Sequence, residues 1–163
     1  MAFTQVLPGF SASLYAQTGA SPTPITAANL SVYATVNALC VSGGQIPVEA
    51  IPAFGQDDAV ASYGIAGSRQ GDKIPVQSQP TSMTVTCAWN PSDTMINLMR
   101  DDAASGKIDR TFIVKATDGT NSVLYSFNAR IGSFQIDSAP GAEAKAIFTI
   151  HPRGNQFGWS YNP

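Results

Sequence analysis

Residues 82–93, which read SMTVTCAWNPSD, contain the part of the sequence that decides the fold. Over residues 82–89 apolar and small polar residues alternate, so the two kinds of side chain point to opposite faces of an extended chain. This pattern predicts a half-buried β-strand with an uncharged polar face. The apolar face carries Met83, Val85, Cys87 and Trp89, and the polar face carries Ser82, Thr84 and Thr86.

A helix is predicted directly after this strand. Asn90 can cap the helix, Pro91 suits its first position, and the Asp93 carboxylate complements the positive end of the helix dipole. Apolar residues then recur at the spacing of one helix face, and Gly106 supplies a stop. We therefore expect a helix over residues 91–104 that packs on the sheet. Its apolar face carries Met95, Leu98, Met99 and Ala103.

The helix is followed by a predicted β-hairpin. Residues 111–117 and 123–131 both alternate between apolar and polar side chains. The segment between them, 118–121, contains the Asp-Gly pair that tight hairpin turns favour. The two strands are therefore expected to pair in antiparallel fashion.

The hairpin leads into a bend and a final strand. Gly132 interrupts the alternation, which predicts a β-bulge or bend before the strand resumes. Residues 138–141 contain a Pro-Gly turn, and residues 144–150 alternate again. With the elements before them, these strands predict a mainly β protein, an antiparallel β-sandwich or partial barrel with one inserted α-helix.

The N-terminal part of the chain is less regular. Residues 1–31 are rich in Pro, Ser, Thr, Ala and Gln, which suggests an N-terminal arm. Residues 32–41 alternate in part and are predicted as a strand. Residues 42–80 have little pattern beyond a possible short strand at 46–50, so we expect a long loop ordered by a partner. The whole chain, 1–163, is expected to be a single domain.

Charge is scarce in this sequence. Nine Lys and Arg and eleven Asp and Glu make 12% of the residues, about half the roughly 25% of typical soluble domains, and the first charged residue is Glu49. The net charge of −2 supplies no basic footprint for phosphate binding, which disfavours a nucleic-acid-binding protein. A soluble monomer normally covers itself in charge. The composition instead suggests a surface that partners cover.

Membrane insertion and secretion have no visible signal. The longest mainly apolar stretch, 32–41, has about half of the roughly 20 residues that a bilayer-spanning helix needs. The N-terminus has no basic region followed by a continuous apolar run, so no secretory signal is expected. Cys40 and Cys87 are expected to be small buried apolar residues, with a disulfide between them as the alternative.

Catalytic and metal-binding residues are also not expected. His151, the single histidine, precedes a proline at a strand end and lacks a Gly-x-Ser-x-Gly context for a triad. The pairs Asp57-Asp58 and Asp101-Asp102 lack the alternating oxygen ligands of a calcium loop. We expect Asp101-Asp102 to lie on a solvated helix surface and Asp57-Asp58 in a solvated loop that can meet a partner. No cofactor is expected either.

Gly64, Gly67 and Gly71 do not form a phosphate-binding loop. The segment lacks the Gly-Lys-Ser/Thr ending and the strand-then-helix context of such loops. We interpret these glycines as a source of backbone flexibility instead. Arg69 and Gln70 within the segment are candidates for contact with a neighbouring subunit.

The order of elements over residues 46–154, about two thirds of the chain, resembles the major tail tube protein of long-tailed, lambda-like siphovirus bacteriophages. The resemblance rests on a long Gly/Asp loop, strand 82–89, the Asn90-Pro91 helix start, hairpin 112–127 and a last strand that ends at Gly154. That fold is shared with contractile-tail tubes and with the tube protein of type VI secretion. The resemblance implies a structural virion protein rather than an enzyme.

In that family, hexameric rings stack into a tube that conducts DNA during genome ejection. The resemblance therefore implies self-association into hexamers, contacts with tape-measure, tail terminator and tail-tip proteins, and DNA that passes through the lumen without specific binding. It also implies a place in the virion tail after assembly in the bacterial cytoplasm, without membrane insertion by this chain.

Candidate contact residues follow from the loop and from the polar strand faces. The expected inter-subunit contacts in 42–80 are Asp57, Asp58, Arg69 and Gln70. The sequence leaves open whether the polar strand residues line the lumen or face a neighbour. These residues are Thr84, Thr86, Lys115, Ser126, Asn128 and Arg130.

Two other functions fit parts of the sequence. A β-sandwich adhesin, or another tail-associated binding module, shares the Ser/Thr-rich surface and would be an ordered monomer with a saturable ligand. An enzyme would need His151 or one of the carboxylate pairs to act on a substrate.

Overall fold

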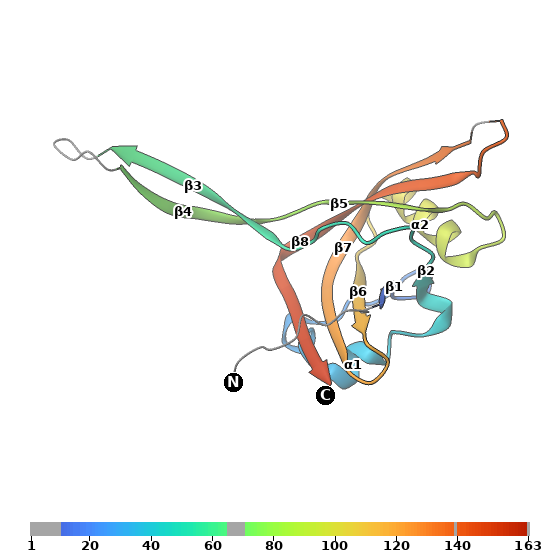
Figure 1. Cartoon of the computed structure of the whole chain (residues 1–163), viewed down its shortest axis with the longest axis horizontal. Helices are drawn as coiled ribbons and strands as arrows, with labels where there is room; N and C mark the ends of the chain where they lie inside the picture. Colours follow the sequence, from blue (N-terminus) through green and yellow to red (C-terminus); the bar gives the residue numbers. More distant parts are fainter. Residues whose placement is uncertain (1–10, 65–70, 139, 163) are drawn as a thin grey trace.

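The computed structural model describes residues 11–64, 71–138 and 140–162, which form one curled antiparallel sheet with a long hairpin that projects from it (Figure 1). The sheet has six strands in the order β2-β1-β6-β7-β8-β5, and β3 and β4 form the hairpin. The strands are β1 Ser11–Ala16, β2 Gln45–Ile46, β3 Gln56–Gly64, β4 Gly71–Pro80, β5 Met83–Ala88, β6 Arg110–Thr117, β7 Ser122–Asp137 and β8 Lys145–Asn162. The helices are α1 Tyr33–Asn37 and α2 Thr94–Ser105, with 3-10 turns at Ala27–Asn29 and Ser42–Gly44.

Strands β7 and β8 are long enough to belong to two halves of the sheet. Residues 122–129 of β7 pair with β6, residues 157–162 of β8 pair with this part of β7, and together with β1 they form what we call the β6 half. Residues 145–150 of β8 lie between β5 and residues 131–137 of β7, and we call this the β5 half. Two register shifts in β7, at 127–129 and 131–134, separate the halves. The predicted bulge at Gly132 is confirmed.

The sheet curls far enough for its two edges to approach each other. Ile46 pairs with Leu14 of β1, and Val48, two residues later, forms a bridge with Cys87 of β5. The Glu49 amide also donates to the Thr86 carbonyl at 3.0 Å. Residues 45–49 therefore link β1 to β5, and the predicted mainly β partial barrel with an inserted helix is confirmed.

The main core lies between α2 and one face of the sheet. Met95, Ile96 and Met99 of α2 are at most 3% exposed, and Leu98 packs beside them. Strands β6, β7 and β8 supply a row of phenylalanines to the same core, with Phe112 and Phe127 stacked at 6.0 Å between ring centroids. The predicted packing of α2 on the sheet is confirmed.

The cap of α2 differs in one detail from the sequence expectation. The Asp93 carboxylate, not Asn90, accepts hydrogen bonds from the amides of Met95 and Ile96, at 2.8 and 3.0 Å. Asn90 instead accepts from Ser92 in the turn that precedes the helix. Gly106 ends the helix in the left-handed conformation, φ 60°, as expected from its position.

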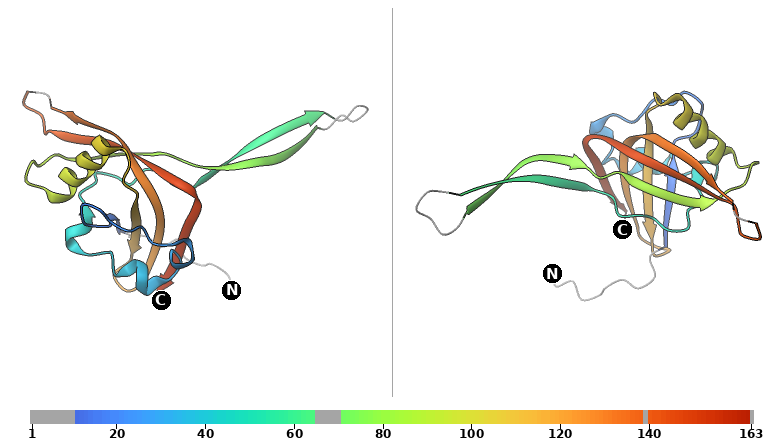
Figure 2. Two further views of the ribbon diagram at one scale, coloured as in Figure 1. Left: turned by 180° about the vertical axis from the view of Figure 1, so that it is seen from behind. Right: turned by 90° about the horizontal axis from the view of Figure 1, so that it is seen from above.

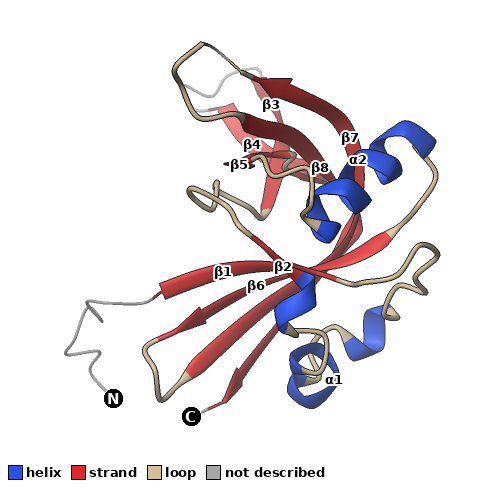
Figure 3. Ribbon diagram, turned by 90° about the vertical axis from the view of Figure 1, so that its right-hand side faces the viewer, coloured by secondary structure: helices blue, strands red, loops and turns tan. Residues whose placement is uncertain are grey.

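The prediction of a strand over 32–41 is wrong. Residues Tyr33–Asn37 form the short helix α1, and Val36 is fully buried against Ile113 and Leu124 on the face of the sheet opposite α2 (Figure 3). Tyr33, Val36, Leu39 and Cys40 recur at helical spacing, and all four pack there. A short apolar run fits both periodicities, so the packing surface decided between them.

The composition of residues 1–31 did not predict the secondary structure that they contain. Within residues 1–31, Ser11–Ala16 is an internal strand rather than part of an arm, because Leu14 and Ala16 are fully buried between β2 and β6. Residues 25–30 then run across the β6 half. The Thr111 hydroxyl accepts from the Ile25 amide, and Asn128 donates to the Ile25 carbonyl at 2.7 Å.

The expected loop at 42–80 is mainly a β-hairpin. Strands β3 and β4 pair along their length with one register shift, and the hairpin extends away from the body of the molecule (Figures 1 and 2). The possible strand at 46–50 is the two-residue β2, Gln45–Ile46. Beyond Gly154, β8 continues to Asn162, an extension that the sequence did not predict.

Candidate assembly surfaces

The β5 half has one face without a helix on it, and we call this the open face. Thr84 pairs with Thr149 and Thr86 with Ile147, and Gln135 lies on the other side of Ile147. The Ser133 and Thr149 hydroxyls lie 3.2 Å apart. Thr84, Ser133 and Gln135 are exposed, and Thr86, Ile147 and Thr149 are half-buried. The centre of the open face therefore carries hydroxyls, an amide and Ile147. Its charged positions are at one end, where Asp137 lies opposite Lys145 and Lys145 forms an ion pair with Glu49.

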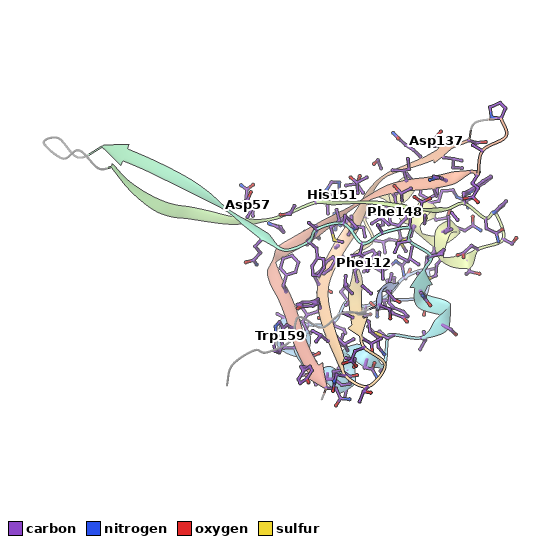
Figure 4. All side chains as sticks on the ribbon, viewed as in Figure 1. Asp57, Phe112, Asp137, Phe148, His151 and Trp159 are labelled. Atoms are coloured by element: carbon purple, nitrogen blue, oxygen red, sulfur yellow. The ribbon has the colours of Figure 1, made fainter. Side chains whose placement is uncertain are left out.

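His151 lies at the rim of the open face, opposite Arg130 on β7 (Figure 4). Its Nδ1 lies 2.8 Å from the Ser82 hydroxyl, and its ring covers Gly132, where a Cβ atom would come within 2.3 Å of Nε2. Among the described contacts, no carboxylate bonds to this ring. The Ser82–His151 contact joins the residue before β5 to β8.

Asp109 joins two arginines beside the open face. Its carboxylate accepts from Arg130 Nε and from Arg153, both at 2.6 Å. Burial by itself raises the pKa of Asp109, but the hydrogen bonds and positive charges of Arg130 and Arg153 outweigh it and hold the pKa below its usual value. Arg153 remains 53% exposed, and the cluster borders a cavity of about 270 Å³ with Pro24 and Asn128.

The Asp109 cluster predicts a pH-dependent contribution to stability. A carboxyl whose pKa is lowered by folding stabilises the protein above its unfolded pKa of about 3.9, and this stabilisation is lost as the pH falls through the folded pKa. Urea unfolding should therefore show Asp109→Asn to be less stable than the wild type at about pH 7, with the difference shrinking at about pH 3. The same difference at both pH values would contradict this assignment.

Two strand edges are free of described strands. Among the described strands, none pairs with the outer side of residues 132–137 in β7, because β6 pairs only with residues 122–129. None of the strands that the structure describes pairs with the outer side of residues 57–64 in β3 either. Unpaired N–H and C=O groups at such edges favour pairing with another chain.

The predicted contact residues in 42–80 are only partly placed. Asp57 is exposed near the base of β3, opposite Gln79, and Asp58 follows it in the same strand (Figure 4). Arg69 and Gln70 lie outside the described residues. Their expected role between subunits remains a proposal.

The candidate lumen residues divide into two groups. Thr84 and Thr86 lie on the open face, but Ser126 is fully buried and donates to the Leu30 carbonyl at 2.6 Å. The expectation that Ser126 lines a lumen or meets a neighbour is therefore wrong, because residues 25–31 cover it. The same segment holds the amide of Asn128, which is half-buried.

Two basic candidates have partners within the chain. Lys115 donates to the Asn37 side chain at 3.3 Å, and Arg130 bonds to Asp109 as described above. Neither side chain is a free charge on the open face. The alternation in β6 and β7 predicted a polar face correctly, but not the segment that covers most of it.

A buried ion pair was missed by the sequence analysis. Asp102 is 3% exposed and bonds to Arg110, which is 1% exposed and also donates to the carbonyls of Gln17 and Gly19 at 2.7 Å each. The expectation of a solvated Asp101-Asp102 pair holds only for Asp101, which faces solvent beside Arg100. The position of Asp102 three residues after Met99 on the buried side of the helix was the available signal.

The cysteines are free thiols, with Cys87 buried and Cys40 half-buried. Burial, aided by Asp93 and Glu49, raises the pKa of Cys87 to about 11. In the described part of the chain, no three potential metal ligands are grouped. None of the helices in these described ranges has the length and apolar character to cross a membrane.

The fold as a whole is similar to chains in solved structures of contractile injection systems and of a tail tube. A chain of an extracellular contractile injection system, from the PVC sheath/tube terminator in its extended state, matches with a TM-score of 0.66 at 14% identity, over 97% of this chain and 99% of that chain. The chain has a tail tube fold. A chain of the anti-feeding prophage tube-terminating cap matches with a TM-score of 0.61 at 13% identity, over 99% and 94% of the two chains.

The tail tube fold extends to a second class of assembly. The SPP1 tail tube matches with a TM-score of 0.54 at 13% identity, over 90% of this chain and 75% of that chain. No protein-family profile and no curated protein sequence match the chain. The expected resemblance is confirmed in the fold, which is common to contractile injection systems and to the SPP1 tube and so does not select between long non-contractile and contractile tails.

Proposed function

We propose that this chain is a structural subunit that self-assembles into hexameric rings, and that the rings stack into a tail tube that conducts DNA. The observation that carries the proposal is a tail tube fold in which two strand edges, residues 132–137 of β7 and residues 57–64 of β3, have no partner among the described strands. A heterologous contact between such edges closes into a ring when the rotation per subunit fits. In the ring, residues 132–137 of one copy would pair with β3 of the next.

The strands around the open face supply enough width for a DNA channel. Strand β4 ends at Pro80 and β5 begins at Met83, so the two strands follow each other with only a short break. Strand β3 lies beside β4, and β8 lies beside β5. If each of six copies contributes about four strands, about 4.8 Å apart and tilted by roughly 40°, the barrel has a circumference of about 150 Å and a diameter of about 48 Å. Inward side chains would leave a bore that a duplex can pass.

The open face has the chemistry that a conducting bore needs. DNA is held by Lys and Arg through its phosphates, with an affinity that increases with each contact. Thr84, Thr86 and Thr149 offer hydroxyls without charge. The basic side chains at the margins, Arg130, Arg153 and Lys145, are held in ion pairs with Asp109 and Glu49. DNA would therefore slide past this face without specific binding.

The projecting hairpin would reach neighbouring subunits or the next ring, with Asp57, Asp58, Arg69 and Gln70 among its contacts. Tape-measure, terminator and tail-tip proteins would set the length and ends of the tube in the virion. The test is electron microscopy of concentrated protein with tape-measure and tail-initiation proteins supplied. Persistent monomers in that mixture would contradict the proposal, and ordered monomers that bind a glycan would favour an adhesin instead.

Placement of the open face in the bore predicts a change in accessibility. In a Thr84→Cys variant, a bulky polyethylene-glycol maleimide should label the monomer, because Thr84 is exposed in the isolated chain. In assembled tubes the same cysteine should be protected, since the reagent must enter the bore. A Cys40→Ser, Cys87→Ala background removes the native thiols. Equal labelling of monomer and tube would show that the open face is not the lumen.

A further inference from the structure

An uncharged apolar strip crosses the end of the β6 half, on the face of the sheet that carries the main core. Cross-strand pairing places four residues in one row, from β1 through β6 and β7 to β8. Tyr161 at the β8 end is 48% exposed. The row consists of Ala12, Ala116, Val123 and Tyr161.

The strip opens into an aromatic groove at the base of the hairpin. Trp159 is 60% exposed and pairs with Tyr125, whose ring meets Phe54 edge-on at 5.4 Å. The groove has a volume of about 490 Å³ and no charged residue in its lining. Gly158 faces Leu30 on one side of the strand, and the next residue, Trp159, lines the groove on the other side. An exposed tryptophan in a neutral hollow, next to an exposed tyrosine on the same strand, is typical of a contact that needs a partner.

Residues 1–10 have the composition and the attachment point to be that partner. They read MAFTQVLPGF, with no charge and with large apolar residues at Phe3, Val6, Leu7 and Phe10. They join the described chain at Ser11, which neighbours Ala12 at the β1 end of the strip. The strip therefore begins where this segment is attached.

The distances allow the segment to cover the strip and reach the groove. Strand β8 lies three strand positions from β1, about 14 Å at the usual strand spacing. Ten residues of extended chain span up to about 33 Å. A segment of the same chain also needs no second molecule, so its effective concentration at the groove is high.

We propose that residues 1–10 dock on the apolar strip of their own chain, with an apolar side chain of the segment against Trp159 in the groove. The segment shields the exposed aromatic rings of the free subunit. The proposal does not depend on tube formation, since it concerns the dilute monomer.

The test uses Trp159 as a reporter in a Trp89→Phe background, which leaves it as the single tryptophan. Removal of residues 1–10 should shift the Trp159 emission to longer wavelength and raise its quenching by acrylamide. A synthetic peptide of residues 1–10, added to the truncated chain, should reverse both changes. A peptide with Phe3→Ser and Leu7→Ser is the matched control and should not.

If the truncated chain does not fold, the full-length double variant Phe3→Ser, Leu7→Ser replaces it in the test. This variant should show the same shift of the Trp159 emission, with an unchanged circular dichroism spectrum. Protection of Trp159 that is independent of protein concentration supports docking within one chain. Protection that disappears on dilution would overturn the proposal in favour of a second copy. Identical Trp159 emission in full-length and truncated chains would overturn it outright.

Discussion

Replacement of Arg110 by methionine is expected to lower the free energy of unfolding by about 3–5 kcal/mol, because it leaves a buried carboxylate without its counterion. Asp102 is 3% exposed, and its Oδ1 lies 2.9 Å from Arg110 Nη2. Water cannot replace the lost partner at that depth. The cost of an uncompensated buried charge therefore exceeds the net value of the pair itself.

The same substitution removes a second set of contacts. Arg110 Nη1 donates to the carbonyls of Gln17 and Gly19, where the chain leaves β1. The guanidinium thus ties three segments together: the C-terminal part of α2, the start of β6 and the turn after β1. Loss of this tie should loosen the N-terminal segment as well as the helix.

Arg100→Met is the matched control, since Arg100 also pairs with an aspartate of α2 but at the surface. That pair is more than half exposed on both sides, and exposed ion pairs contribute at most about 1 kcal/mol. Urea unfolding monitored by circular dichroism would compare the two variants through their midpoints at equal slope. Similar midpoints for Arg110→Met and Arg100→Met would show that the buried pair does not stabilise the fold.

Gly158→Ala is expected to destabilise the protein by about 1–3 kcal/mol, the usual range for overpacking. A Cβ atom at this position would lie 2.1 Å from the Leu30 carbonyl oxygen, so the backbone of the covering segment would have to move. That movement would break the hydrogen bond from Ser126 to the same carbonyl. Thermal unfolding should show a lower midpoint.

Gly132→Ala is the control for this substitution. Its Cβ atom would come close only to the exposed His151 ring, a side chain that can rotate away at the cost of one hydrogen bond to Ser82. The loss of stability should be clearly smaller than for Gly158→Ala. Equal losses would mean that the segment around Leu30 yields as easily as a surface side chain.

Local patterns in the sequence predicted the second half of the chain well. Strand β5, helix α2 and the β6–β7 hairpin each bury one face against the common core, so their periodicity is visible in the sequence itself. The Asp-Gly turn and Gly106 act through backbone conformation, which is also local. These elements, with their order, were sufficient for the fold class.

The errors fall where a neighbouring segment decides the structure. The helix α1 and the strand β1 have few residues, and each is defined by what it packs against in β6 and β7. Ser126 and Asn128 look like surface residues in the sequence because the carbonyls that accept their hydrogen bonds belong to residues about a hundred positions earlier. For the assembly surfaces, Thr84 and Thr86 were predicted as a polar face, but unpaired edges become visible only when the strand order is known.

The long strands β7 and β8 make the body of the protein one cooperative unit. Each runs through both halves of the sheet, so one half cannot lose its strand pairing while the other half keeps its own. The β3–β4 hairpin pairs only with itself and shares no ladder with the sheet. It can therefore open at a small free-energy cost while the body stays folded, and its amide hydrogens should be among the first to exchange with solvent.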